Sequence, residues 1–388
     1  MSGPRILLVN HSAEVSGAEQ SLLAFLAAAD RGRFEFEVAC PGRGALAEGL
    51  ARLRVPVRPV RLERLTRQAD PAVWFQQGFA LLRGTRQLHA VMRRVRPDLV
   101  HANTTIAALA TVPDQDVPLV WHVRDLVPLG MAGRVIYGKS AAVIAISEAV
   151  AHTFAEDQDK VRVIHNGIDA DGFAAQAKDG GDVRRTLNLP DLAAPVAVVA
   201  QLTPWKGHDV LLESWVEVVQ RVPQAVLLVV GAAMWRRDLR WQRELQHRAE
   251  QLGLGGSVRF LGYRNDVPAV MSVCRCVVIP SQAEPFGRAA LEAMALSKPV
   301  VGTAAGGLPE VVQDGGTGIL VAPGDAAALA GAVIHVLADR ALADELGRAG
   351  ARRVREVFDI RRTARRTQEV YEEVLSSRRL ADLSGKLE

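Results

Sequence analysis

Short apolar runs alternate with longer amphipathic stretches along nearly the whole chain. RILLVN and EFEVAC are separated by AEQSLLAFLAAA, whose apolar residues recur at helical spacing. Because a strand that is followed by a helix commonly pairs in parallel with the next strand, this rhythm predicts parallel sheets covered by helices. The expected strands are 5–10, 35–40, 98–103, 118–123, 141–147 and 161–166 in a first series, and runs near 196–202, 225–231, 257–263, 276–281, 299–306 and 318–324 in a second.

A polar segment separates the two series. Residues 171–195 contain KDGGD and LNLPDLAAP, and a chain of 388 residues is long for one core. We therefore predict two α/β domains, each a Rossmann-like, doubly wound parallel sheet, over residues 1–180 and 190–365. Such sheets bind ligands at the carboxyl ends of their strands, so two that face each other would enclose a central cleft. The last stretch, 366–388, is expected to form a helix that crosses back to the N-terminal domain.

The composition narrows the class of protein. Hydrophobic residues make up 49% and charged residues 23%, as in an ordinary globular chain, and a net charge of +4 does not indicate a nucleic-acid partner. The three cysteines, Cys40, Cys274 and Cys276, suit neither a disulfide framework nor a four-ligand metal site. The N-terminus lacks the features of a signal peptide, and no apolar run approaches the roughly 18 residues of a membrane span. We expect a cytoplasmic protein.

The segment SQAEPFGRAALEAMA places two glutamates around a proline. Proline disfavours helical backbone at the residue before it and suits the first helical position, so Glu284 is expected on a loop and the helix is expected to start at Pro285. The N–H groups of Phe286 and Gly287 would then form an anion site, with Glu292 about two turns along. The two carboxylates could hold sugar hydroxyls around a phosphate, or they could be solvated surface acids.

Other candidate residues follow predicted strands. Lys206 lies in a strand-to-helix turn, where it could neutralise a phosphate or simply be exposed. The glycine-rich GTAAGGLPEVV, and Gly17 just before a helix expected to start near Ala18, would allow close approach of a ligand to the backbone or serve only as turns. His122 and Asp125 lie near the end of PLVWHVRD, although a lone histidine is more often structural than functional.

Three further patterns are weaker. PGRGALAEGL resembles a dinucleotide fingerprint, but it follows the second strand and begins with Pro41, so we predict a turn. In the Arg-rich segment 52–96 the aromatics Trp74, Phe75 and Phe79 are grouped between Arg67 and Arg83 rather than interleaved with the arginines, and the later RRTARR has none. Both segments suit a solvated face, or at most an acidic membrane surface or a phosphorylated acceptor. Asp-x-Asp occurs in polar loops at 114–116, 157–159 and 169–171, where we expect solvated acids rather than metal ligands.

Taken together, these motifs resemble those of the retaining glycosyltransferases of family 4. The resemblance runs from Arg5 to roughly Leu375 and is most specific at Glu284 and Glu292, which match the family's E-x7-E signature. VIHNGID, AQLTPWKG, LGYRNDV and GGLPEVV occur in the order and spacing of that family. The resemblance implies the GT-B fold, which consists of two Rossmann-like domains.

The resemblance also implies a role for each matching position. Glu284 would hold hydroxyls of the donor sugar, and Glu292 would hold the nucleotide ribose. Lys206 and the amides of Phe286 and Gly287 would bind the donor phosphates. His122 would lie over the donor sugar and assist transfer, which makes His122, Glu284 and Lys206 the expected catalytic residues. The other implied donor contacts are Gly17, Gly307 and Leu308 near the sugar, phosphates or acceptor, and Tyr263 and Arg264 around the nucleobase.

Two positions depart from the family pattern. Relatives commonly carry arginine five residues before the lysine, where this chain has Gln201, and many have two glycines where it has Ser16 and Gly17. Glutamine can bind a phosphate oxygen but supplies no charge, so stabilisation of the leaving group would fall more heavily on Lys206.

The family pattern predicts a retaining, metal-independent sugar transfer without a cofactor. The co-substrate would be a UDP- or GDP-linked sugar, and the acceptor a small molecule or a lipid-linked glycan. Peripheral membrane contact through the Arg-rich N-terminal domain is a further expectation. Two alternatives stay open: a nucleotide-sugar 2-epimerase on the same fold, and a non-catalytic nucleotide-sugar-binding subunit. The departure at Gln201 is the best support for the second, and the intact Glu284, Glu292, Lys206 and His122 argue against it.

Overall fold

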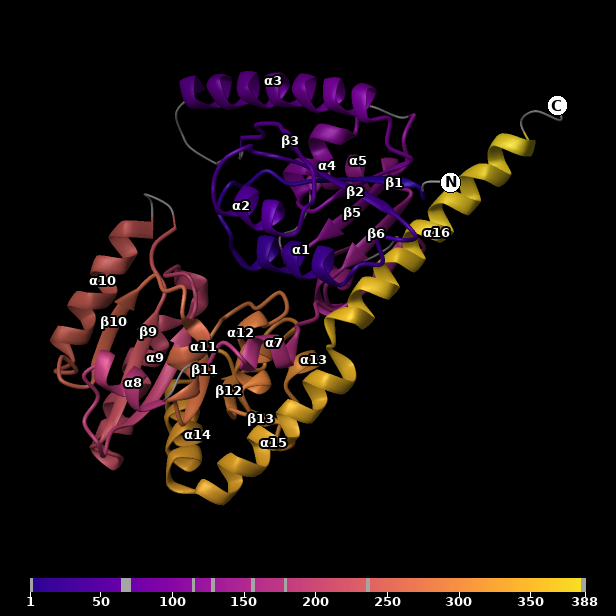
Figure 1. The fold of residues 1–388 in the computed structure, drawn as a ribbon. Coiled ribbons are helices and arrows are strands. Elements are labelled where there is room, and N and C mark those ends of the chain that lie inside the picture. Colours follow the sequence, from indigo (N-terminus) through magenta and orange to yellow (C-terminus); the bar gives the residue numbers. More distant parts are fainter. Residues whose placement is uncertain are drawn as a thin grey trace. The chain divides into compact units, whose positions relative to one another are not determined.

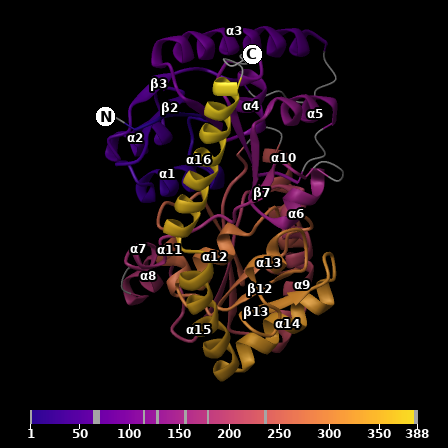
Figure 2. The same cartoon turned by 90° about the vertical axis from the view of Figure 1, so that its right-hand side faces the viewer.

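The protein is described here by a computed structural model, which covers residues 3–63, 71–113, 116–126, 130–154, 158–177, 180–234 and 238–384. The chain divides into two compact units: unit 1 is Met1–Gly167 with Ile360–Glu388, and unit 2 is Ile168–Asp359 (Figures 1 and 2). Each unit contains one sheet whose paired strands are all parallel, with helices connecting them. The predicted α/β fold of two doubly wound parallel sheets is confirmed.

Unit 1 contains a seven-stranded sheet in the order β3-β2-β1-β4-β5-β6-β7. All six expected strands are present. The sequence pattern missed β3, because it has only three residues and no apolar run. The strands are β1 (Arg5–Val9), β2 (Glu35–Cys40), β3 (Val57–Pro59), β4 (Leu99–Ala102), β5 (Leu119–Val123), β6 (Ala142–Ala145) and β7 (Val161–Val163).

The helices of unit 1 bury their apolar faces against this sheet and one another. The long terminal helix α16 packs on α1, and Tyr371 and Val374 of α16 join the core that Leu22 and Leu26 of α1 form over β1 and β2. The helices are α1 (Gly17–Ala28), α2 (Ala45–Arg52), α3 (Pro71–Val95), α4 (Thr105–Thr111), α5 (Gly130–Lys139), α6 (Glu148–Ala151) and α16 (Ile360–Ser384).

Unit 2 contains a six-stranded sheet in the order β10-β9-β8-β11-β12-β13, and all six expected strands are present. Its core includes Trp215, which is fully buried. The strands are β8 (Ala194–Val199), β9 (Ala225–Val230), β10 (Val258–Gly262), β11 (Cys276–Ile279), β12 (Val300–Thr303) and β13 (Gly318–Val321). The helices are α7 (Ala170–Ala174), α8 (Gly180–Thr186), α9 (His208–Arg221), α10 (Asp238–Gln251), α11 (Val267–Ser272), α12 (Arg288–Ala295), α13 (Leu308–Val311), α14 (Ala326–Ala338) and α15 (Arg340–Val357).

The boundary between the units differs from the expected one. The polar stretch 171–195 was expected to link two domains, but it carries α8 and all of α7 except Ala170, and both helices belong to unit 2. Helix α7 packs against α12 and α15, and α8 packs against α11. The amide of Ile168 donates to the carbonyl of Phe358 at 2.9 Å. Because these contacts tie the stretch to unit 2, the chain divides at Gly167 and again at Asp359.

Strand order reverses once in each sheet. In unit 1 the reversal lies between β1 and β4, and in unit 2 it lies between β8 and β11. At such a switch point the loops after the two central strands diverge, which leaves a crevice where doubly wound sheets bind ligands. The loops after these four strands are therefore the first places to look for a site.

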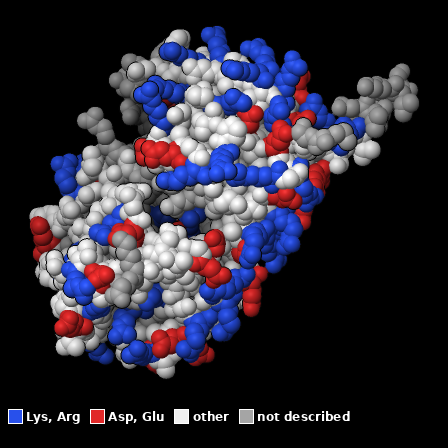
Figure 3. Space-filling model, in the orientation of Figure 1, with Lys and Arg blue, Asp and Glu red and all other residues white. Residues whose placement is uncertain are grey.

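Helix α16 carries more arginines than acids, with Glu369, Glu372 and Glu373 between its two groups of arginines. Figure 3 shows Lys and Arg side chains gathered along this helix. No single helix of the described residues is long and apolar enough to cross a membrane; α14 and α15 pass that test only as a pair, which is bent by 100°. The exposed arginines of α16 are at positions 361, 362, 365, 366, 378 and 379.

Candidate functional site

In unit 2, the loops at the switch point bring Lys206 and Glu284 together. Lys206 ends the short 3-10 helix η2 (Pro204–Lys206) after β8, and Glu284 lies on the loop after β11. The Lys206 Nζ is 2.6 Å from Glu284 Oε2, and the two side chains are only 15% and 9% exposed. The hydroxyl of Ser281 donates to the same carboxylate oxygen at 3.1 Å. The Lys206 ammonium also lies 4.1 Å from the centre of the Trp205 ring. The result is a nearly desolvated ion pair where a ligand is expected.

Gly207 allows these two loops to approach so closely. It adopts φ +69° as the N-cap of α9, a left-handed conformation that favours glycine. A Cβ at this position would lie 1.9 Å from the carbonyl oxygen of Pro280 at the end of β11. Any side chain here would therefore push apart the two loops that carry Lys206 and Glu284.

Helix α12 begins three residues later than expected. The prediction of a start at Pro285 is wrong, because Gly287 adopts φ +103° and the helix begins at Arg288. Glu292 is then four residues into the helix, and its Oε1 accepts a hydrogen bond from Arg288 Nε at 2.9 Å. Glu292 is buried, which raises the pKa of its carboxyl, while the charge of Arg288 opposes that shift. The Phe286 ring is also buried, 5.9 Å from that of Phe358.

The glycine-rich turn after β12 supports the Glu284 loop. The amide of Gly307 donates to the carbonyl of Glu284 at 2.7 Å. Leu308 is fully buried, and its side chain fills the space beside Gly287, where a Cβ would lie 2.7 Å from Leu308 Cδ1. These two residues position the loop, and their expected contact with a sugar or diphosphate stays a prediction.

The remaining predicted donor contacts of unit 2 also follow strands. Gln201, after β8, places its Nε2 2.6 Å from the sulfur of Met234. Tyr263, after β10, is 68% exposed and offers a free aromatic face. Arg264 binds Asp266 through two hydrogen bonds of 2.8 and 2.7 Å, which fix the guanidinium. All three lie just beyond the carboxyl ends of β8 and β10, and their contact with a nucleotide stays a prediction.

In unit 1, Gly17 is the first residue of α1 rather than the residue before it. Ser16 caps this helix with Glu19 in a capping box. The buried Glu19 also accepts a hydrogen bond from Asn10 Nδ2 at 3.1 Å, and Asn10 Oδ1 accepts one from Asn103 Nδ2 at 2.9 Å. The loops after β1 and β4 are thus joined at the switch point of this sheet by a buried polar network.

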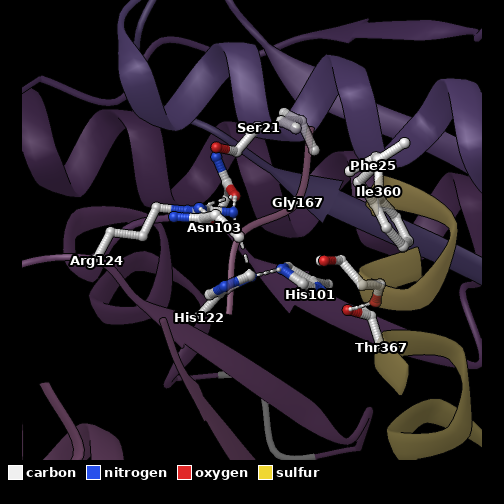
Figure 4. Close-up of a pocket in the computed structure, with 12 residues that line it drawn as sticks. Ser21, Phe25, His101, Asn103, His122, Arg124, Gly167, Ile360 and Thr367 are labelled. Atoms are coloured by element: carbon white, nitrogen blue, oxygen red, sulfur yellow. Dashed lines mark hydrogen bonds between the residues drawn. The ribbon is translucent and has the colours of Figure 1, made fainter. Parts of the chain in front are cut away.

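His122, near the end of β5, lines a small pocket of mixed polar and apolar side chains beside this network (Figure 4). The accessible volume is about 10 Å³, roughly room for one water molecule. The guanidinium of Arg124 anchors one side: its Nη1 donates to Asn166 at 2.9 Å and its Nη2 to Asn103 at 2.9 Å. The residues that line the pocket are Ser21, Leu22, Phe25, His101, Asn103, His122, Arg124, Asn166, Gly167, Ile360, Thr363 and Thr367.

His122 belongs to a chain of buried hydrogen bonds. Its Nδ1 lies 3.2 Å from His101 Nε2 and 3.3 Å from Arg124 Nη2, and His101 Nδ1 lies 2.6 Å from the Tyr371 hydroxyl. Burial, and then the charge of Arg124, lowers the pKa of His101 to about 3 and that of His122 well below the usual value. Both rings are therefore neutral at pH 7, and His122 is not a lone histidine.

The sequence pattern missed several residues around the Lys206–Glu284 pair and in the hydrogen-bond chain of His122. Ser281 and Trp205 adjoin predicted residues, so the motifs containing Glu284 and Lys206 could have indicated them. His101 lies within the apolar run DLVHAN on β4, which pairs with β5, so histidines on two neighbouring strands were a usable signal. Tyr371 gave no signal, because it lies 270 residues from His101 on an amphipathic helix.

Of the three Asp-x-Asp motifs, the one at 169–171 is fully described by the structure. Asp169 caps α7 by accepting a hydrogen bond from the amide of Gly172 at 3.0 Å, and Asp171 pairs with Arg355 at 3.0 Å. Asp114 and Asp157 lie outside the described residues. Within the described part of the chain, no three His, Cys, Asp or Glu side chains are grouped so that they could hold a metal ion.

Comparison with known families gives two adjoining matches. The family model described as Glycosyltransferase Family 4 matches residues 15–171, and the model described as Glycosyl transferases group 1 matches residues 182–353. The first covers most of unit 1, and the second covers the part of unit 2 that carries Lys206, Glu284 and Glu292.

Individual proteins show the same similarity. The D-inositol 3-phosphate glycosyltransferase of Nocardioides sp. is 33% identical over 262 residues, which are 62% of this chain and 56% of that protein. The chain thus spans little more than half the length of this relative. Glycogen synthase of Mycobacterium tuberculosis is 29% identical over 329 residues, 78% of this chain and 76% of that protein.

Among solved structures, Anabaena HepE in complex with UDP and glucose superposes with a TM-score of 0.81 at 27% identity, covering 95% of this chain and 99% of that one. Sucrose-phosphate synthase from Thermosynechococcus elongatus has a TM-score of 0.78 at 22% identity, covering 96% of this chain and all of that one, and shows the shared GT-B fold.

Proposed function

We propose that this chain, which belongs to the group 1 glycosyltransferases of family 4, moves a sugar from a nucleoside-diphosphate sugar to an acceptor. The observation that carries the proposal is the desolvated pair of Lys206 and Glu284 at the switch point of unit 2. A sugar diphosphate contains both groups that such a pair suits: phosphate oxygens for the ammonium and hydroxyls for the carboxylate.

Lys206 would stabilise the negative charge that develops on the departing diphosphate. Its ammonium is held between the Trp205 ring and Glu284, so it needs little reorganisation when that charge appears. Glu284 would accept hydrogen bonds from the donor sugar and Glu292 from the ribose, while the amides of Phe286 and Gly287 would approach the phosphates. The proposal includes no metal or other cofactor, because Lys206 and these amides supply the electrostatic stabilisation.

We propose a UDP-linked donor first and a GDP-linked donor second. The support for UDP is the similarity to HepE, whose structures contain UDP and UDP-glucose. Tyr263 and Arg264 would frame the base. Transfer would retain the configuration of the sugar, with the acceptor attacking on the face from which the diphosphate leaves. No carboxylate would form a covalent intermediate, unlike in retaining glycosidases.

We propose a phosphorylated or otherwise anionic polyol as the acceptor class. The support is the similarity to D-inositol 3-phosphate glycosyltransferases, together with exposed arginines on α16 of unit 1. If the N-terminal domain contacts a membrane, as the sequence led us to expect, the acceptor would be lipid-linked. Vesicles of anionic and neutral lipid would decide between a free and a membrane-borne acceptor, since only the second predicts co-sedimentation with the anionic vesicles.

The proposal is tested in two steps. A thermal-shift screen with UDP, GDP and ADP sugars identifies the donor, and release of nucleoside diphosphate is then measured with and without candidate acceptors. Transfer predicts release that depends on the acceptor, and NMR of the product should show the anomeric configuration of the donor. A 2-epimerase would instead convert the donor without any acceptor. Donor binding with neither reaction would favour the non-catalytic binding subunit.

A further inference from the structure

The hydrogen bonds around His122 determine which of its nitrogens carries the proton. A guanidinium can only donate, so the contact with Arg124 Nη2 requires His122 Nδ1 to accept. His101 Nε2 faces the same Nδ1 at 3.2 Å and must therefore carry its own hydrogen. A neutral imidazole carries one hydrogen, so His101 Nδ1 is unprotonated and accepts a hydrogen bond from the Tyr371 hydroxyl at 2.6 Å.

The protonation of His122 Nε2 follows in the same way. Because its Nδ1 accepts, the neutral imidazole must carry its hydrogen on Nε2. That atom is buried and has no hydrogen-bond partner among the described residues. An unpaired buried donor is unfavourable, and a hydrogen bond to a ligand oxygen or a water molecule would satisfy it. His122 is itself only 5% exposed, so its ring is held by what surrounds it.

Tyr371 is placed independently of its hydroxyl. Its ring is fully buried and meets Phe34, Phe25 and His101 edge-on, at centroid distances of 5.8, 6.4 and 5.7 Å. Aromatic packing thus fixes the ring, and the hydroxyl is left to set the direction of the hydrogen bonds. Figure 4 shows His101 and His122 side by side beneath Arg124.

We propose that Tyr371 and His101 are positioning residues for His122: they keep its Nδ1 an acceptor, so that the ring presents an N–H donor at Nε2. The consequence for catalysis rests on the proposed function, in which His122 would lie over the donor sugar. His122 would then assist transfer by donating a hydrogen bond to an oxygen atom of the bound donor. It would not act as a general base, because the nitrogen that could take a proton is already occupied by Arg124 and His101.

The test reads the tautomers directly. The full-length chain is labelled with ¹⁵N-histidine, and long-range ¹H–¹⁵N correlation spectra are recorded at pH 7, with signals assigned from His101→Gln and His122→Gln spectra. The wild type should show hydrogen on Nε2 of both rings. Tyr371→Phe keeps the ring but removes the hydroxyl, and the population of Nδ1–H tautomer should rise about fivefold at this histidine pair, the effect of losing one hydrogen bond.

Matched variants separate positioning from packing. Tyr137→Phe makes the same chemical change at a tyrosine whose hydroxyl donates to Asp159, and it should leave the His122 signals unchanged. His101→Gln can still donate to His122 and accept from Tyr371, so the His122 tautomer should be kept. His101→Met leaves Arg124 as the remaining donor to His122 Nδ1, so the Nδ1–H population of His122 should rise as it does in Tyr371→Phe. A wild-type His122 that carries its hydrogen on Nδ1, or is charged, would overturn the inference. The inference would also be overturned if Tyr371→Phe, like Tyr137→Phe, left the tautomer populations unchanged.

The spectra need no substrate, so they decide the inference even if the proposed function fails. If Tyr371→Phe does not fold, the wild-type and His101→Gln spectra still give the answer. If transfer is established, Tyr371→Phe should lower kcat in proportion to the measured loss of the His122 Nε2–H tautomer and leave the donor KM nearly unchanged, because the donor stays bound through unit 2. An inactive wild type with the assigned tautomers would support the positioning and contradict the transferase.

Discussion

Replacing Lys206 by methionine tests the ion pair on which the proposed donor site depends. The change keeps the length of the side chain and removes the ammonium that lies 2.6 Å from Glu284. Glu284 is then left as an unpaired carboxylate whose side chain is only 9% exposed. Breaking a buried pair in this way typically costs about 3–5 kcal/mol. We expect about 3 kcal/mol, the lower end, because the Ser281 hydroxyl still donates to Glu284.

The double-mutant cycle isolates the pair. Glu284→Gln in the Lys206→Met background removes the unpaired charge, so the double variant should be more stable than Lys206→Met alone, with a coupling of about 1.5 kcal/mol or more. Urea unfolding followed by tryptophan fluorescence measures these differences, with Trp215 buried in the core of the same unit. Each variant should also lose most of its turnover, for which the assay is release of nucleoside diphosphate.

An exposed ion pair of the same unit serves as the control. Arg248 and Glu213 form a salt bridge with side chains 46% and 43% exposed. Arg248→Met should therefore change the free energy of unfolding by no more than about 0.5 kcal/mol. The reasoning is refuted if Lys206→Met is as mild as this control, or if the cycle shows no coupling. Near-wild-type turnover of Lys206→Met would separately refute its phosphate role.

Three further changes test other parts of the account. Gly207→Ala should destabilise unit 2 by about 3 kcal/mol or more, since its Cβ would lie 1.9 Å from Pro280 O. Gly324 also has a left-handed backbone but open space around it, so Gly324→Ala should cost only about 1 kcal/mol in the same urea titration. The pKa of about 3 for His101 lies below its unfolded value, so its stabilising contribution is complete above about pH 6.5 and declines as the pH falls toward 3. The slope of unfolding free energy against pH between 5 and 6 should accordingly be about 1 kcal/mol per unit smaller in His101→Gln, and equal slopes would contradict a neutral buried ring. Gln201→Arg adds a charge near the proposed phosphates and should lower the donor Kd roughly tenfold by calorimetry; no change would place position 201 away from them.

Apolar periodicity predicted the two sheets well, because parallel strands buried on both faces read as nearly continuous apolar runs. The short β3 has no such run and was missed. Helix α12 shows a conflict between two local signals. Proline favours the first helical position, but Gly287 two residues later takes a left-handed φ that no helix can include, and the glycine prevails.

The candidate site could be predicted only where it is local in sequence. Lys206 and Glu284 lie in separate motifs, each recognisable from its own turn, although their direct pairing appears only once β8 and β11 lie side by side. The environment of His122 depends on residues far away. Tyr371 reaches His101 because α16 packs on α1, and no pattern within either segment specifies that contact.

The central claim is that Glu284 and Glu292 hold a nucleotide-sugar donor, and calorimetric titration of the donor tests it most directly. The nucleotide sugar with the largest thermal shift is titrated into the wild type and into Glu284→Gln, Glu292→Gln and Glu217→Gln. The last changes an exposed glutamate on α9 of the same unit. We predict that Glu284→Gln and Glu292→Gln each weaken binding at least tenfold, the cost of losing a charged hydrogen bond of about 1.5–3 kcal/mol, while Glu217→Gln binds like the wild type. Equal affinity in all four proteins would contradict the account.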